Sequence, residues 1–127
     1  MNLAFYGTLR DRDILHHVVG ESLEPYFVET RAVKGWACLR IVDQAYPLLR
    51  SDAAAVTTFD LYHETPEDCW RRLVDYEGDE YFPGELSIDG ISYTVFLPEN
   101  DLQPSPEEWS LETFQRRDKT QYLKDLL

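Results

Sequence analysis

The sequence predicts an α+β domain in which a mixed sheet of about five to seven short strands curls into a barrel flanked by a few helices. The 127 residues, 43% of them apolar, are enough for one core and a single domain over residues 1–127. The expected elements run strand, helix, several strands, helix, hairpin and helix, which is not the strict alternation of a doubly wound sheet. Because few helices are available to cover two sheet faces, curling the sheet is an economical way to remove exposed strand edges.

The N-terminal elements are a strand, a turn and a helix. Residues 2–6 read as a short strand that ends at Gly7-Thr8. Residues 11–19 then carry apolar side chains at helical spacing, namely Ile14, Leu15, Val18 and Val19. Gly20 is expected to cap this helix at its C-terminus.

The middle of the chain is expected to be extended. Residues 26–42 read as two extended segments, with Gly35 as a bulge or a point of close approach. Residues 46–49 resume an extended path, and residues 53–62 supply another strand rich in β-forming side chains.

The second half begins with a well-marked helix. Thr65 is its N-cap candidate, Pro66 occupies its first turn, and Gly78 is placed to end it. Residues 85–88 and 91–97 then form a hairpin around the two-residue turn Asp89-Gly90. Ser105-Pro106-Glu107-Glu108 has capping-box spacing and is expected to open a last helical region that runs to the C-terminus.

Composition argues against several kinds of partner and site. The formal charge of −12 would repel nucleic acid and anionic lipid. A basic start followed by a long apolar stretch is missing, so we expect a soluble cytoplasmic protein without a membrane partner. Cys38 and Cys69 lack partners at ligand spacing, so neither a metal site nor a disulfide is indicated, and both are expected to be small buried hydrophobes.

Two segments are candidates for a functional site. Tyr6-Gly7-Thr8-Leu9-Arg10 stands between a strand and a helix, where successive N–H groups can converge on an anion and Arg10 can add a bidentate contact. The alternative is an ordinary turn. In Tyr76-Glu77-Gly78-Asp79-Glu80-Tyr81, Glu77 by itself reads as a solvated last-turn residue, and Asp79-Glu80 as a solvated turn.

Taken together, Phe-Tyr-Gly-Thr-Leu-Arg near the N-terminus, Tyr46-Pro47, and Leu73-x-x-Tyr76-Glu77-Gly78-x-x-Tyr81 resemble the gamma-glutamyl cyclotransferase-like family, particularly its short gamma-glutamylamine cyclotransferase branch. The resemblance implies a mixed β-barrel around a cavity, with the Tyr-Gly-Thr-Leu loop as one wall and the glutamate of the Glu-Gly pair as the acid/base residue. It therefore implies that Glu77 is catalytic. The implied substrate-binding residues are Tyr6, Gly7, Thr8, Leu9, Arg10 and Tyr81.

Two positions depart from the pattern of that family. Val74 stands where the family often has an aspartate, which affects at most a helix interaction. Phe82-Pro83 stands where an arginine commonly follows the tyrosine. The loss of an arginine near the cavity would change how the charge of a substrate is recognised.

The implied reaction closes a γ-glutamyl amine or dipeptide into 5-oxoproline and releases the amine, with no metal or other cofactor. The substrate's own α-amino group is the nucleophile, so orientation supplies much of the acceleration and one carboxylate can carry the proton. Amides of residues 7–9 would bind either the α-carboxylate or the oxyanion. A non-catalytic small-molecule-binding or regulatory module on the same barrel remains an alternative, as does a related transferase or hydrolase. The sequence does not indicate an oligomeric state.

Overall fold

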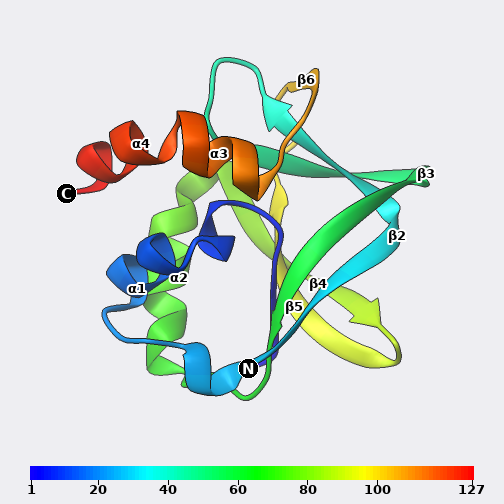
Figure 1. Ribbon diagram of the computed structural model, residues 1–127. Coiled ribbons are helices and arrows are strands. Elements are labelled where there is room, and N and C mark those ends of the chain that lie inside the picture. Colours follow the sequence, from blue (N-terminus) through cyan, green and yellow to red (C-terminus); the bar gives the residue numbers. More distant parts are fainter.

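The computed structural model describes all 127 residues as one curled six-stranded sheet with four α-helices packed along one side (Figure 1). The strand order is β4-β5-β1-β3-β2-β6, in which β1 is parallel to β5 and every other neighbour is antiparallel. The strands are β1 (Leu3–Phe5), β2 (Phe27–Ile41), β3 (Pro47–Tyr62), β4 (Tyr81–Ile88), β5 (Ile91–Pro98) and β6 (Pro104–Glu108). The α+β class and the mixed, curled sheet predicted from the sequence are therefore confirmed.

The α-helices are α1 (Arg12–Val19), α2 (Asp68–Glu77), α3 (Leu111–Arg117) and α4 (Lys119–Leu126). There are also three short 3₁₀ helices, η1 (Thr8–Arg10), η2 (Glu24–Tyr26) and η3 (Gly78–Glu80). The first helix is capped at both ends, and Gly20 is the C-terminal cap that the sequence predicted. Asp11 accepts the N–H groups of Asp13 and Ile14 at its start, and Gly20 ends it with φ 77°.

A long bent hairpin of β2 and β3 takes the place of four shorter predicted segments. The pairing changes register between Lys34 and Trp36, where the partner passes from Val56 to Ser51, and Gly35 has φ 100°. Both strands change direction at this corner in Figure 1. The bulge predicted at Gly35 is confirmed, and the segments merge because a bulge bends a strand without ending its pairing.

The two faces of the sheet bury separate parts of the core. On β1, Leu3 and Phe5 pack against the helices, whereas Ala4 and Tyr6 join a second cluster on the other face with Phe59 and Val95. This division follows from the alternation of side chains along a strand. As a result, the chain that leaves β1 lies between the two clusters.

Two expected helix starts are wrong. Thr65 is buried and its hydroxyl donates to the Met1 carbonyl, so it anchors the N-terminus and α2 begins at Asp68. Residues 104–108 form the edge strand β6, and Ser110, not Ser105, caps α3 by accepting the N–H of Thr113. An edge strand tolerates Pro104 and Pro106 because one row of its backbone groups needs no partner.

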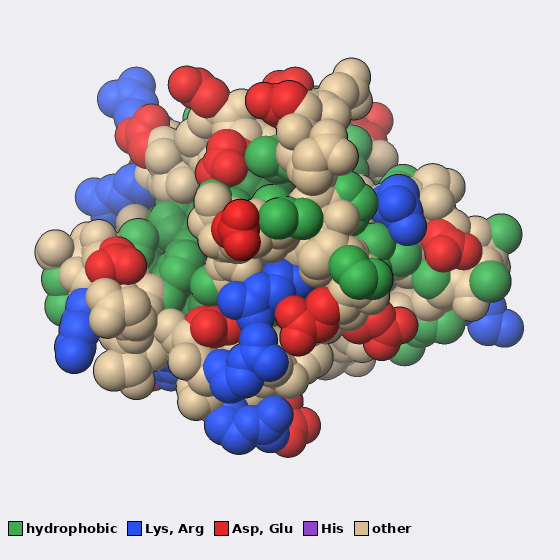
Figure 2. All heavy atoms as spheres, turned by 90° about the horizontal axis from the view of Figure 1, so that it is seen from above, with side chains coloured by type: hydrophobic (Ala, Val, Ile, Leu, Met, Phe, Trp, Pro, Cys, Tyr) green, Lys and Arg blue, Asp and Glu red, His purple; other side chains and the backbone are tan.

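Charged side chains of both signs are interspersed over the face seen in Figure 2, where basic groups near the middle have acidic neighbours. Ten ion pairs are present, most of them at least partly exposed. None of the helices has both the length and the apolar character that crossing a membrane would require.

Candidate active site

A small cavity of about 80 Å³ opens where the end of β1 meets the end of α2 and the start of β3. Its walls are mostly apolar or aromatic, and its only ionisable carboxyl groups are those of Glu77 and Glu80. The lining residues are Ala4, Phe5, Tyr6, Gly7, Thr8, Leu9, Tyr46, Pro47, Tyr76, Glu77, Glu80, Tyr81, Phe96 and Tyr122. The cavity therefore brings together the two segments that the sequence singled out.

Glu77 is the last residue of α2, and Gly78 turns the chain away from the helix axis. Gly78 has φ 64° and ψ −152°, a conformation that is nearly exclusive to glycine, and its N–H returns to the Val74 carbonyl. The Glu77 carboxylate lines the cavity and has no hydrogen-bond or ion-pair partner in the protein. Burial, followed by the negative charge of Glu80, raises its pKa from 4.5 to about 8.

A chain of three hydroxyl groups runs along one wall. Thr8 Oγ1 lies 2.7 Å from the Tyr76 hydroxyl, which lies 2.5 Å from the Tyr122 hydroxyl of α4. Burial raises the pKa of Tyr76 far above its ordinary value, so this phenol stays neutral and acts through hydrogen bonds. The chain ties η1, α2 and α4 into one wall.

Another part of the wall depends on a close approach between the loop after β1 and the start of β3. A Cβ atom on Gly7 would lie 3.2 Å from both Cδ and Cγ of Pro47, so a glycine lets the loop after β1 pack against the start of β3. The Tyr81 hydroxyl donates to the Pro47 carbonyl at 2.5 Å, which fixes Tyr81 over the cavity. This contact gives the Tyr46-Pro47 pair a physical role beside the loop.

Glu80 and Tyr46 belong to the cavity although the sequence analysis did not propose them as site residues. The Tyr46 hydroxyl donates to the Glu80 carboxylate, at 2.8 Å from Oε1 and 3.0 Å from Oε2. The expectation of a solvated turn was thus wrong for Glu80, while Asp79 is exposed as expected. Spacing gave no signal because the two residues are 34 positions apart and meet only in the folded chain.

Arg10 is the one proposed binding residue that does not line this cavity. Its Nε lies 3.4 Å from Asp60 Oδ2, outside the cavity wall. Phe82 is 41% exposed and Val74 is 37% exposed, and neither lines the cavity. Because Tyr81 faces the cavity, strand alternation turns the side chain at position 82 outward.

The cavity contains no histidine or cysteine. The cysteines are unpaired, with Cys69 buried as expected and Cys38 only half-buried. Cys69 lies with Glu21 and Asp68 in a group whose potential ligand atoms fall within 4.8 Å of one another. Its thiol donates to Glu21 Oε1 at 3.3 Å, so this group holds itself together by an internal hydrogen bond on the α1–α2 side of the molecule.

Solved structures share this architecture. The uncharacterised protein PH0828 from Pyrococcus horikoshii superposes with a TM-score of 0.67 at 18% identity, covering 97% of both chains. Two Arabidopsis thaliana proteins, At5g39720.1 and At3g28950.1, give TM-scores of 0.64 and 0.62 at 18% and 12% identity. Each covers 98% of this chain, which in turn covers 87% and 78% of theirs. At these identities the likeness establishes the fold alone.

No curated protein sequence matches the chain. A family model does, and it is described as gamma-glutamyl cyclotransferase, AIG2-like. The match runs over residues 3–111, from β1 to the start of α3, and so includes both the loop after β1 and the Glu77-Gly78 pair. The chain therefore belongs to the AIG2-like gamma-glutamyl cyclotransferase family.

Proposed function

We propose that the protein cyclises the γ-glutamyl group of a γ-glutamyl amine or dipeptide to 5-oxoproline, with Glu77 as the general acid/base. The observation that carries the proposal is the position of the Glu77 carboxylate, which lines the same aromatic cavity as the loop after β1 and has no partner in the protein. A carboxylate of this kind is free to exchange a proton with a bound ligand.

The reaction needs the α-nitrogen to lose two protons, one before ring closure and one after it, and the leaving nitrogen to gain two. The α-ammonium gives a proton to Glu77, and the free amine attacks the δ-carbonyl carbon to close the five-membered ring. The C–N bond to the leaving amine then breaks as Glu77 returns the proton to that nitrogen. The ionised Glu77 takes the second proton from the ring nitrogen, which leaves the neutral lactam, and this proton passes to the released amine to give its ammonium form. A pKa of about 8 suits both steps because the protonated and the ionised forms of Glu77 are both populated near neutral pH.

The wall around residues 7–9 would hold the rest of the substrate. The Gly7 N–H donates no hydrogen bond within the protein, and the first N–H groups of a helix such as η1 have no partner inside it. They are suitable donors to the α-carboxylate or to the oxyanion of the tetrahedral intermediate. Tyr6, Thr8, Leu9 and Tyr81 complete the proposed binding surface, whereas Arg10 lies outside it.

The test is to incubate the protein with a panel of γ-glutamyl amines and dipeptides and to measure 5-oxoproline. Replacing Glu77 by glutamine keeps the shape of the side chain and removes its titration, so turnover should fall about 10²–10⁴-fold. Glu67→Gln is the matched control because Glu67 is exposed at the other end of α2. Equal turnover by wild type and Glu77→Gln would refute the role of Glu77, and saturable binding without turnover would favour a binding module.

A further inference from the structure

A second cavity, of about 140 Å³, lies on the other side of the loop after β1. It is enclosed by the bent hairpin β2–β3 on one side and by residues 108–111 on the other. Arg10 and Tyr6 both line it, and Tyr6 also lines the candidate active site. Thus η1 directs Thr8 into one cavity and Arg10 into the other.

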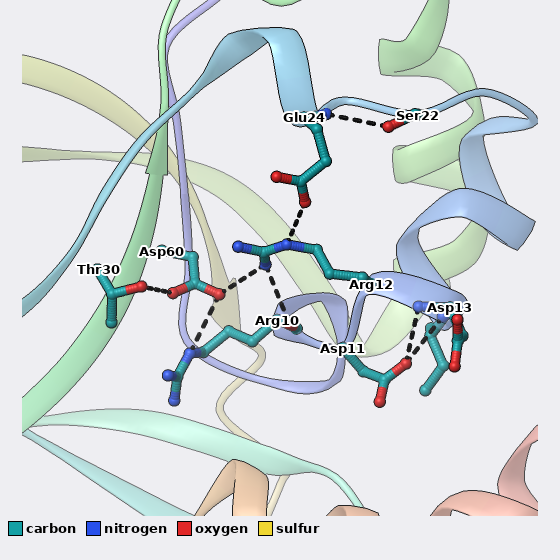
Figure 3. Close-up of polar contacts among 9 residues, drawn as sticks. Arg10, Asp11, Arg12, Asp13, Ser22, Glu24, Thr30 and Asp60 are labelled. Carbon is teal, nitrogen blue, oxygen red and sulfur yellow. Dashed lines mark hydrogen bonds and ion pairs between the residues drawn. The ribbon is translucent and has the colours of Figure 1, made fainter.

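The Arg10 side chain is only 14% exposed, yet none of its N–H groups makes a hydrogen bond in the protein. Its Nε is fully buried and lies 3.4 Å from Asp60, which is a charge contact without a hydrogen bond. Figure 3 shows the two terminal nitrogens of Arg10 turned away from Asp60, with no contact drawn to them. The terminal nitrogens of Arg10 keep some access to solvent, and a largely buried guanidinium with unused donors is stabilised when a ligand or solvent accepts from it.

Asp60 does not account for the orientation of Arg10 because its oxygens already have better partners. Arg12 Nη1 donates to Oδ2 at 3.0 Å and Thr30 Oγ1 donates to Oδ1 at 2.7 Å. Arg12 also pairs with Glu24 through Nε, so both its Nε and its Nη1 already have carboxylate partners (Figure 3). Arg10 is therefore the arginine of this cluster whose terminal nitrogens remain available.

The second cavity offers further donors near Arg10. The Thr58 side chain lines it and makes no hydrogen bond in the protein. Ser110 Oγ accepts the N–H of Thr113 at 3.2 Å, which leaves the hydroxyl proton of Ser110 free to donate. Glu108 also lines the cavity but lies beyond ion-pairing distance of Arg10, and its charge disfavours a ligand that carries two negative charges.

We propose that this second cavity binds a small carboxylate through the two terminal nitrogens of Arg10, with the hydroxyl groups of Thr58 and Ser110 as additional donors. The planar fork of a guanidinium matches a carboxylate in a bidentate contact. The walls combine polar and apolar residues, and together with the modest volume they favour a short organic acid with a single charge. The site is separate from the cavity that contains Glu77 and does not depend on the proposed cyclisation.

The test is an NMR titration of ¹⁵N-labelled protein with sodium acetate, with sodium chloride at equal ionic strength as the reference. Wild-type protein should show saturable shifts at the Arg10 Nε–H, the Trp109 indole N–H and the Ser110 amide, all of which belong to residues that line the second cavity. Shifts confined to Gly7, Thr8 and Glu77 would instead put acetate in the candidate active site and overturn the proposal. Absence of any saturable shift would overturn it as well.

Variants give an independent check. Arg10→Gln should abolish saturation, and Arg10→Lys, which retains the charge but loses the fork, should weaken binding about tenfold. Arg71→Gln is the matched control, since Arg71 is exposed on α2 and makes no ion pair, and it should bind acetate like wild type. Unchanged affinity in folded Arg10→Gln would overturn the proposal, and the wild-type titration decides the matter if this variant does not fold.

Discussion

Glu77 and Glu80 lie three residues apart at the end of α2, and the fold gives them different surroundings. The Tyr46 hydroxyl donates to the Glu80 carboxylate. Glu77 has no such donor and lies beside the neutral phenols of Tyr76 and Tyr81. Burial without a hydrogen-bond donor, followed by the negative charge of Glu80, therefore raises the pKa of Glu77 to about 8.

This difference predicts the pH dependence of turnover. If ionised Glu77 accepts the proton of the α-ammonium, kcat/KM should rise with pH and level off above about 8. Replacing Glu80 by glutamine removes the nearby negative charge, so the pKa of Glu77 falls and the rising limb should move to lower pH. Asp79→Asn, next to Glu80 but exposed, should leave the limb in place. If the rising limb of the pH profile is at the same pH in Glu80→Gln as in wild type, the electrostatic role of Glu80 is contradicted.

Residue types alone indicated part of this site. The glycine after Glu77 indicated where α2 ends, and the loop after β1 contains the residue types expected of a cavity wall. The partnership of Tyr46 with Glu80 could not be predicted, because it depends on how closely the start of β3 approaches η3. Arg10 shows the converse: a residue adjacent to the loop in sequence, and chemically suitable, that the helical turn of η1 directs to another cavity.

At the scale of elements, Asp11 connects the beginning of α1 to the C-terminal helices. Its side chain is fully buried, caps α1 through Oδ1, and accepts from Gln115 and Lys119 through Oδ2. Burial opposes the charge of Asp11, but the bonds from Gln115, Lys119 and Ile14 outweigh it, and its pKa lies below the ordinary 3.8. The network holds α3 and α4 against η1, and α4 supplies Tyr122 to the cavity.

Replacing Asp11 by alanine should therefore destabilise the protein by about 2–4 kcal/mol, because the cap is lost and buried donors are left unpaired. Urea denaturation at neutral pH would measure the change. Since the folded-state pKa is depressed, the contribution of Asp11 is present above the unfolded value and should be lost as the pH falls below it. Asp13→Ala, whose side chain is 73% exposed, should cost less than about 1 kcal/mol. Equal losses in the two variants would be evidence against the buried network.

Helix and strand boundaries could be predicted where local chemistry decides them. Gly20 and the Asp89-Gly90 turn act within a few residues, and each has the expected role, with φ 51° and 78° at the turn. The starts of α2 and α3 differ from the predicted ones because tertiary contacts, and not local capping, decide what the predicted cap residues bind. Thr65 bonds to Met1 and Ser105 to the Arg40 carbonyl, partners 64 and 65 positions away.

At the scale of the whole molecule, the net charge of −12 acts on any substrate that approaches the cavity. A γ-glutamyl dipeptide carries one net negative charge at neutral pH, whereas a γ-glutamyl alkylamide is neutral. Raising the ionic strength shortens the range of the repulsion. On the proposed function, kcat/KM for the dipeptide should increase with salt by about two- to fivefold. The neutral amide is the control and should change little, and parallel responses of the two substrates would contradict the effect.

By itself the sequence determined the α+β class, the family, and the segments that hold Glu77 and the loop after β1, because alternation, caps and turns are local properties of a chain. Only the tertiary structure decided which of these residues face the same cavity. The bend at Gly35, the approach of Gly7 to Pro47 and the turn at Gly78 combine to set the surroundings of Glu77, Glu80 and Arg10. The residues around them come from distant positions in the sequence. Burial among these residues raises the pKa of Glu77 and leaves Arg10 with unused donors.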